Sequence, residues 1–122
     1  MPRLPDDAAR ELRAGYLGCV KYVDEQVGSI VSEMRRLDLW DDDAVVVFTS
    51  DHGYGLGEHG HWGKVSLYEI DAKVPLFVRD PRLKAFMGKK SRALVELLAL
   101  GKTIIDLAGI SPTFYGTMNG RS

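Results

Sequence analysis

The chain has 122 residues with a formal net charge of −1, and 45% of its residues are hydrophobic. This charge excludes a nucleic acid or an anionic membrane surface bound by bulk electrostatic attraction, and there is no apolar run of about twenty residues to span a membrane. The single cysteine, Cys19, excludes an intrachain disulfide. The length predicts one domain at most. The charged N-terminal sequence shows no signal peptide, so the sequence assigns no compartment.

A long helix is the first element expected. Apolar side chains recur at steps of three and four from Leu12 to Leu37, which is the spacing of one stripe along a helix. The pattern predicts a helix from Ala8 to Leu37, with Asp6 or Asp7 as its N-cap. A coiled coil is the alternative for such a stripe, but the segment stands alone and a strand follows directly, which disfavours it.

The next element is an unbroken apolar, β-branched run. It follows a turn of three aspartates at residues 41–43 and extends from Val45 to Thr49. Such a run predicts a strand buried on both faces, as in a parallel sheet. In open α/β sheets, ligand sites lie just beyond the carboxyl ends of strands. The sequence directly after Thr49 is therefore where we expect a functional site.

Three further elements are expected downstream. Residues Leu67 to Ile70 predict a short helix, Val74 to Val78 a second strand, and Arg92 to Leu107 a helix that Gly109 ends. The order helix, strand, site loop, strand, helix indicates an α/β fold. Two strands are too few for an independent sheet domain. We therefore expect residues 1–122 to form a single, incomplete domain.

The loop at residues 50–64 contains all three histidines of the chain. Asp51 and His52 offer a carboxylate oxygen and an imidazole nitrogen side by side, and Gly53 allows the turn that would let both reach one metal ion. Zinc or manganese suits such a mixed donor pair on ligand chemistry alone. The plainer interpretation is a helix-capping aspartate followed by a surface histidine, and the Gly-rich loop together with Lys64 favours a site.

Lys64 closes this loop and presents a point charge suited to an anionic oxygen, with Trp62 nearby to exclude water. His59 and His61 alternate, and would face the same side if the segment is extended. Ligands, acid–base groups and packed loop residues are all open interpretations of these two histidines. Glu58 is either a carboxylate partner for a histidine or one half of a salt bridge at the end of the loop.

With these residues the chain resembles the sulfatase family of the alkaline phosphatase-like superfamily, and its iduronate-2-sulfatase-like branch in particular. Three segments carry the likeness: residues 15–28, residues 45–64 and residues 74–78. The resemblance implies the three-layer α/β/α alkaline phosphatase-like fold, with this chain as the C-terminal portion of a catalytic domain. It also implies a sulfuric ester hydrolase that acts on a sulfated small molecule or sugar, of the glycosaminoglycan type, with no nucleic-acid or membrane partner.

The resemblance implies specific roles in the loop. Asp51 and His52 match the second pair of the family's divalent-metal ligands, usually for calcium. Because calcium favours all-oxygen shells, zinc and manganese stay open. Lys64 matches the lysine that binds the sulfate group and is the catalytic candidate of this chain, stabilising charge. His61 is the second substrate-binding candidate.

Two motifs of the family do not occur in these residues. They are the Cys/Ser-x-Pro-x-Arg motif, whose first residue becomes formylglycine, and a pair of aspartates that follows an early strand; Asp6 and Asp7 precede a helix instead. We therefore expect the chain to carry half of the metal site, to be inactive by itself, and to need an N-terminal half of the same domain as partner. The alternatives are a phosphoesterase of the same superfamily, or a non-catalytic fragment that acts as a binding module.

Overall fold

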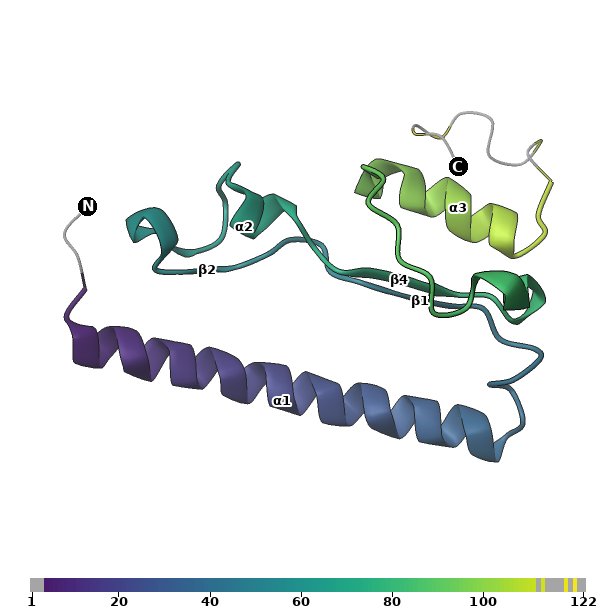
Figure 1. Ribbon diagram of the computed structural model, residues 1–122, viewed down its shortest axis with the longest axis horizontal. Helices are drawn as coiled ribbons and strands as arrows, with labels where there is room; N and C mark the ends of the chain where they lie inside the picture. Colours follow the sequence, from purple (N-terminus) through teal and green to yellow (C-terminus); the bar gives the residue numbers. More distant parts are fainter. Residues whose placement is uncertain (1–3, 112, 114–117, 119, 121–122) are drawn as a thin grey trace. The chain divides into compact units, whose positions relative to one another are not determined.

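The computed structural model describes residues 4–111, 113, 118 and 120, and Figure 1 follows the chain through its elements. The chain divides into two compact units. The first unit consists of residues 1–40 and 50–75, and the second of residues 41–49 and 76–122. Both units contain helix and strand, in agreement with the mixed α/β class expected from the order of elements.

Helix α1 of the first unit spans Asp6–Arg36, so the long helix is confirmed to within two residues of its expected start. Its N-cap is Pro5 and no side chain makes a capping hydrogen bond, so the predicted aspartate cap is wrong. The helix begins at Asp6, one residue earlier than an Asp6 cap would allow, so Asp6 and Asp7 both lie inside the first turn. There they still favour the positive end of the helix dipole, as the two arginines of the last turn favour the negative end.

Little of the apolar stripe of α1 is buried. Ile30 is 60% exposed, and Ala9, 8% exposed, is the one buried hydrophobic residue of the core in the described part of the chain. The packing of this helix on the strand at residues 45–49 therefore stays a prediction. The described helices include none that is both long and apolar enough to cross a membrane.

A small hairpin follows the candidate metal ligands in the first unit. Strand β2, Gly55–Leu56, pairs antiparallel with β3, Trp62–Gly63, and a 3₁₀ turn at Glu58–Gly60 lies between them. This hairpin was not predicted from the sequence, because two-residue strands are too short to show an alternating pattern. Helix α2, Glu69–Ala72, is the short helix expected at residues 67–70, found two residues later.

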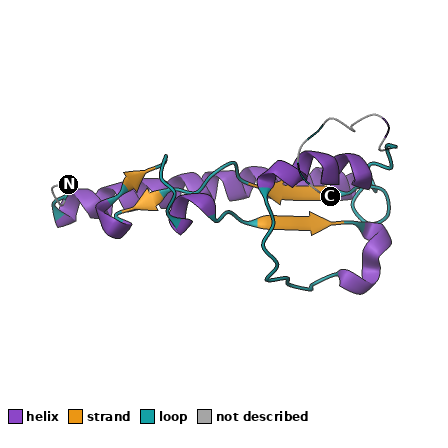
Figure 2. Cartoon of the chain, turned by 90° about the horizontal axis from the view of Figure 1, so that it is seen from above, coloured by secondary structure: helices purple, strands orange, loops and turns teal. Residues whose placement is uncertain are grey.

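The second unit is built on an antiparallel pair of strands, drawn as opposed arrows in Figure 2. Strand β1, Val46–Thr49, pairs with β4, Leu76–Arg79. Both strands were expected, but the prediction of a parallel strand buried on both faces is wrong. The pairing is antiparallel and the side chain of Phe48 is 38% exposed. An apolar, β-branched run signals the preference for strand, whereas burial on both faces also needs covering elements on each side.

Helix α3, Leu100–Leu107, continues a 3₁₀ turn at Leu97–Ala99. The prediction of a helix starting at residue 92 is therefore wrong for its first turns, since residues 91–96 are not helical. The Ser91 hydroxyl accepts a hydrogen bond from the Ala93 N–H at 3.1 Å, and such local side-chain bonds compete with helix formation.

The end of α3 is as expected at Gly109. The Gly109 N–H donates to the Asp106 carbonyl at 2.9 Å, and the Ile110 N–H donates to the Ile105 carbonyl at 3.1 Å. These two bonds form a Schellman closure, in which glycine takes the left-handed conformation just beyond the helix. The sequence signal at the end of this helix is thus fully realised in the backbone.

Candidate active site

Asp51 and His52 come directly after β1, as the sequence predicted. The His52 N–H donates to Asp51 Oδ1 at 3.0 Å, and His52 Nε2 lies 3.5 Å from Asp51 Oδ2. The Asp51 side chain is 84% exposed. The carboxylate and the imidazole therefore converge on one small, solvent-facing volume.

The donor atoms of this pair fit part of a metal site. His52 Nδ1 lies 2.8 Å from the Gly53 carbonyl oxygen, and because a carbonyl only accepts, Nδ1 carries the proton. When His52 is neutral, its lone pair therefore lies on Nε2, beside the carboxylate, while the other ring N–H is donated to a carbonyl, as metal-binding histidines commonly do. Among the described residues no cluster of three His, Cys, Asp or Glu side chains is suited to a metal. The pair by itself therefore supplies two potential donor atoms and no more.

The positive charge of Lys64 affects the pKa of Asp51. Partial desolvation works to raise the pKa of Asp51, but the charge of His52, backbone N–H groups and the charge of Lys64 together lower it below its ordinary value. The lysine ammonium is thus within electrostatic range of the Asp51 carboxylate. Opposite charges stabilise the ionised carboxylate, the form that binds a cation.

The hairpin holds the middle of the loop against α1. The Arg13 side chain donates to the Leu56 carbonyl at 3.0 Å and lies over the Trp62 ring, 5.4 Å from its centroid. Glu58 Oε2 accepts from the Leu56 N–H at 2.7 Å, and backbone N–H groups of Glu58 and Leu56 lower the pKa of Glu58 against partial desolvation. The hydrogen-bond partner of the Glu58 carboxylate is therefore the backbone. It is neither a histidine nor the cation of a salt bridge, the two partners that the sequence suggested.

The two later histidines of the loop have different surroundings, because the segment between them turns. His59 has a positive φ of 53° inside the 3₁₀ turn and stacks on Tyr68, with ring centroids 4.8 Å apart. The side chain of His61 is only 19% exposed, and its Nε2 lies 3.2 Å from Oδ2 of Asp71. The segment is therefore not extended, so the condition under which both histidines would face the same side is not met.

Asp71, in α2, is 4% exposed and was not among the site residues predicted from the sequence. Its Oδ2 accepts from the Ser66 N–H at 2.7 Å. Hydrogen bonding with Ser66 lowers the pKa of Asp71, burial opposes this, and the charge of His61 adds to the lowering. Nothing in the local sequence marks this aspartate, since an acid in a short helix is ordinarily solvated. The contact with a loop residue five positions away is visible only in the fold.

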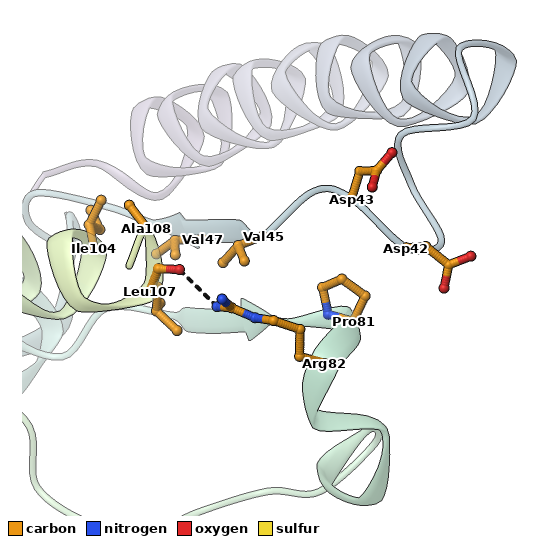
Figure 3. A pocket seen from close by; sticks show the side chains of 9 residues that line it. All are labelled: Asp42, Asp43, Val45, Val47, Pro81, Arg82, Ile104, Leu107 and Ala108. Atoms are coloured by element: carbon orange, nitrogen blue, oxygen red, sulfur yellow. Dashed lines mark hydrogen bonds between the residues drawn. The ribbon is translucent and has the colours of Figure 1, made fainter. Parts of the chain in front are cut away.

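Two pockets are formed by residues of the described part of the chain, and neither of these includes Asp51, His52 or Lys64. The larger, about 500 Å³, lies within the second unit (Figure 3). Arg82 lines this pocket. Its guanidinium donates to the Leu107 carbonyl at 2.8 Å and is paired with the Asp80 carboxylate at 2.7 Å. A cation already engaged on two sides is a structural group, so this pocket does not replace the loop as the candidate site.

The family model for sulfatases matches residues 2–110. The chain belongs to the sulfatase family. Among curated sulfatases, iduronate 2-sulfatase of Mus musculus is 35% identical over 88% of this chain. Choline-sulfatase of Rhizobium meliloti (strain 1021) is 33% identical over 87% of the chain.

A solved structure agrees with this assignment. BT4656, in complex with its substrate D-glucosamine-2-N,6-O-disulfate, is 34% identical over 88% of this chain, with a TM-score of 0.76. The chain spans 23% of the mouse sulfatase, 20% of the choline-sulfatase and 21% of BT4656. It therefore corresponds to about a fifth of the sulfatases that it matches.

Proposed function

We propose that this sulfatase chain contributes a sulfate-binding lysine and half of a metal site to the hydrolysis of sulfate esters. The observation that carries the proposal is the presence of Asp51, His52 and Lys64 in one loop, with His52 Nε2 3.5 Å from Asp51 Oδ2. The charge of Lys64 also contributes to the lowered pKa of Asp51. A sulfated sugar is the proposed substrate class. It is supported by the disulfated glucosamine bound to BT4656.

The chemistry of the proposed reaction suits these side chains. A sulfate ester carries negative charge on its non-bridging oxygens, and the Lys64 ammonium is proposed to bind one of them and to stabilise the charge that develops as the ester bond breaks. His61 is proposed as a second substrate-binding group on the same loop. Asp51 and His52 are proposed to hold a divalent cation, calcium by family resemblance, with zinc and manganese as alternatives. When bound, such a cation supplies further positive charge.

The attacking group is proposed to come from elsewhere in the domain. The 122 residues contain no Cys/Ser-x-Pro-x-Arg sequence, so no residue here matches the formylglycine position, and covalent catalysis needs a nucleophile. Exposed apolar side chains support a missing partner surface: Phe77 is 64% exposed and Ile30 60%. We therefore propose residues 1–122 as the C-terminal portion of a three-layer, alkaline phosphatase-like catalytic domain.

A chimera tests this proposal. The segment of BT4656 that matches this chain is replaced by residues 1–122, and hydrolysis of D-glucosamine-2-N,6-O-disulfate is measured. We expect turnover by the chimera and none by the chain alone. Lys64→Ala is compared with Lys73→Ala, a matched loss of one lysine of the same unit that lies at the C-terminal cap of α2.

Each outcome separates the candidate functions. Turnover that Lys64→Ala lowers strongly and Lys73→Ala preserves supports the sulfatase proposal. Preference for an aryl phosphate over an aryl sulfate would favour a phosphoesterase of the same superfamily. A folded chimera without either activity would favour a non-catalytic binding module.

A further inference from the structure

Asp71 joins three segments of the loop that carries the candidate site. Its backbone carbonyl accepts from the Gly53 N–H at 2.7 Å, next to the proposed metal ligands. Its carboxylate accepts from Ser66 and lies beside His61, so it contacts the chain on both sides of Lys64. No other acid described here bonds to residues that flank the lysine so closely.

The backbone next to Lys64 is strained. Val65 has a φ of 81° and its side chain is 91% exposed. A β-branched residue is a true outlier in this left-handed region, and such strain persists only when the surroundings hold it. The N–H of the next residue, Ser66, is the group that the buried Asp71 carboxylate accepts, so the carboxylate restrains the strained turn.

The pairing of Asp71 is not complete. His61 Nε2 lies 3.2 Å from Asp71 Oδ2, within ion-pair distance, and neither Nε2 nor Asp71 Oδ1 has a hydrogen-bond partner among the described residues. Buried polar atoms are ordinarily bonded, so each exception calls for an explanation. Gly55 makes this arrangement sterically accessible, because a Cβ there would lie 2.5 Å from Cδ2 of His61.

We propose that Asp71 is a positioning residue, which fixes the strained Lys64–Val65–Ser66 turn and the His61 ring so that Lys64 is held in place for an anionic oxygen. This role for Lys64 rests on the proposed function. The anchoring of the turn by Asp71 stands on the geometry alone. Asp71 acts through Lys64 and His61 and touches no substrate itself.

Amide hydrogen exchange on the full chain tests the anchor without any activity. In the wild type we expect the Ser66 N–H to be protected, and in Asp71→Asn to exchange about tenfold faster or more, because a charge-assisted hydrogen bond is weakened. The Gly53 N–H is the internal control, since it donates to the backbone carbonyl of Asp71, which the substitution leaves intact. Unprotected Ser66 in the wild type overturns the anchor, and so does loss of protection at Gly53 together with Ser66, which would make Asp71 a folding residue.

Coupling in the chimera tests the positioning role. Asp71→Asn should lower kcat/KM by about tenfold to a hundredfold when Lys64 is present, as small misplacements of a charge stabiliser do, and should change little in the Lys64→Ala background. Val65→Gly should restore part of the loss, because glycine adopts the positive φ without strain. Additive losses without rescue overturn the positioning role. An inactive wild-type chimera would overturn the proposed function instead, and hydrogen exchange would still decide the anchor.

Discussion

The two compact units each bury one aspartate, and the two aspartates are satisfied in different ways. In the second unit Asp80, 7% exposed, accepts from the backbone N–H of Arg82 at 2.9 Å and from its guanidinium at 2.8 and 2.7 Å. In the first unit Asp71 accepts a hydrogen bond from the Ser66 N–H, and its Oδ1 has no hydrogen-bond partner among the described residues.

The difference separates a structural carboxylate from one beside a site. Asp80 closes a turn with its own neighbour two residues away, so its energetics are local and complete. Asp71 instead connects Ser66 and His61 across the loop that carries the candidate site, and its Oδ1 has no hydrogen-bond partner among the described residues. A buried carboxylate with incomplete pairing, whose partners lie on both sides of a lysine in the chain, is more informative about function than a fully paired one.

The largest effect that would break this comparison concerns activity. In the chimera, Lys64→Ala should lower kcat by about a hundredfold to a thousandfold, by analogy with the loss of one oxyanion donor. Arg82→Ala should leave kcat within about twofold, because this cation of the second unit is already engaged by Asp80 and the Leu107 carbonyl. Steady-state kinetics measures both, and equal losses would show that the two units do not divide function and structure.

Thermal unfolding should reverse this order. Asp80→Ala removes the side-chain cap of the 3₁₀ turn at Pro81–Phe86 and leaves Arg82 without its carboxylate, so we expect Tm of the full chain to fall by roughly 5 °C. Asp71→Asn keeps the volume and an accepting oxygen and should lower Tm less. Circular dichroism checks both variants, and a larger drop for Asp71→Asn would make Asp71 the structural carboxylate of the pair.

Acid should affect the second unit through Asp80. The Arg82 side chain lowers the pKa of Asp80 below its ordinary value of 3.8, although burial opposes this. The ionised pair therefore stabilises the fold fully above the ordinary value, and this contribution is lost as the pH falls through the lower pKa of the folded state. Between about pH 6 and pH 3, Tm of the wild type should fall further than that of Asp80→Asn. Parallel losses in the two proteins would contradict the assignment.

The smallest expected effect is metal binding by the chain alone. Asp51 and His52 supply two donors, whereas calcium takes about six to eight oxygens, so calorimetry at micromolar metal should record little or no heat. Asp51→Ala should remove whatever weak binding occurs at higher concentration. A tight site that survives this substitution would mean that other residues hold the metal.

Local patterns sufficed to predict the regular elements. The three–four stripe predicted α1, the apolar runs predicted β1 and β4, and Gly109 predicted the end of α3. These features depend on neighbouring residues, so sequence contains the information. The sense of strand pairing was not predicted, because it depends on which strand comes alongside rather than on the residues of β1.

The candidate site was predicted as a set of residues but not as a geometry. Asp51, His52 and Lys64 were chosen for their chemistry, and their proposed roles stay predictions. Asp71 was missed because its meaning comes from Ser66 and His61, which the turn brings to it. The sequence left open whether His59 and His61 lie in an extended segment, and the 3₁₀ turn between them gives them different surroundings.

For anyone interpreting genetic variants of this chain, Gly53 and the glycines of α1 differ in the space available for a side chain. A Cβ on Gly53 would lie 1.9 Å from the Ile70 carbonyl oxygen, whereas one on Gly15 or Gly28 of α1 would meet nothing within 4 Å. In a saturation library of the chimera selected for activity, codon 53 should therefore retain glycine alone, while codons 15 and 28 accept many residues. A missense change at Gly53 would thus be disruptive whatever residue it introduces, although glycine contributes no functional group.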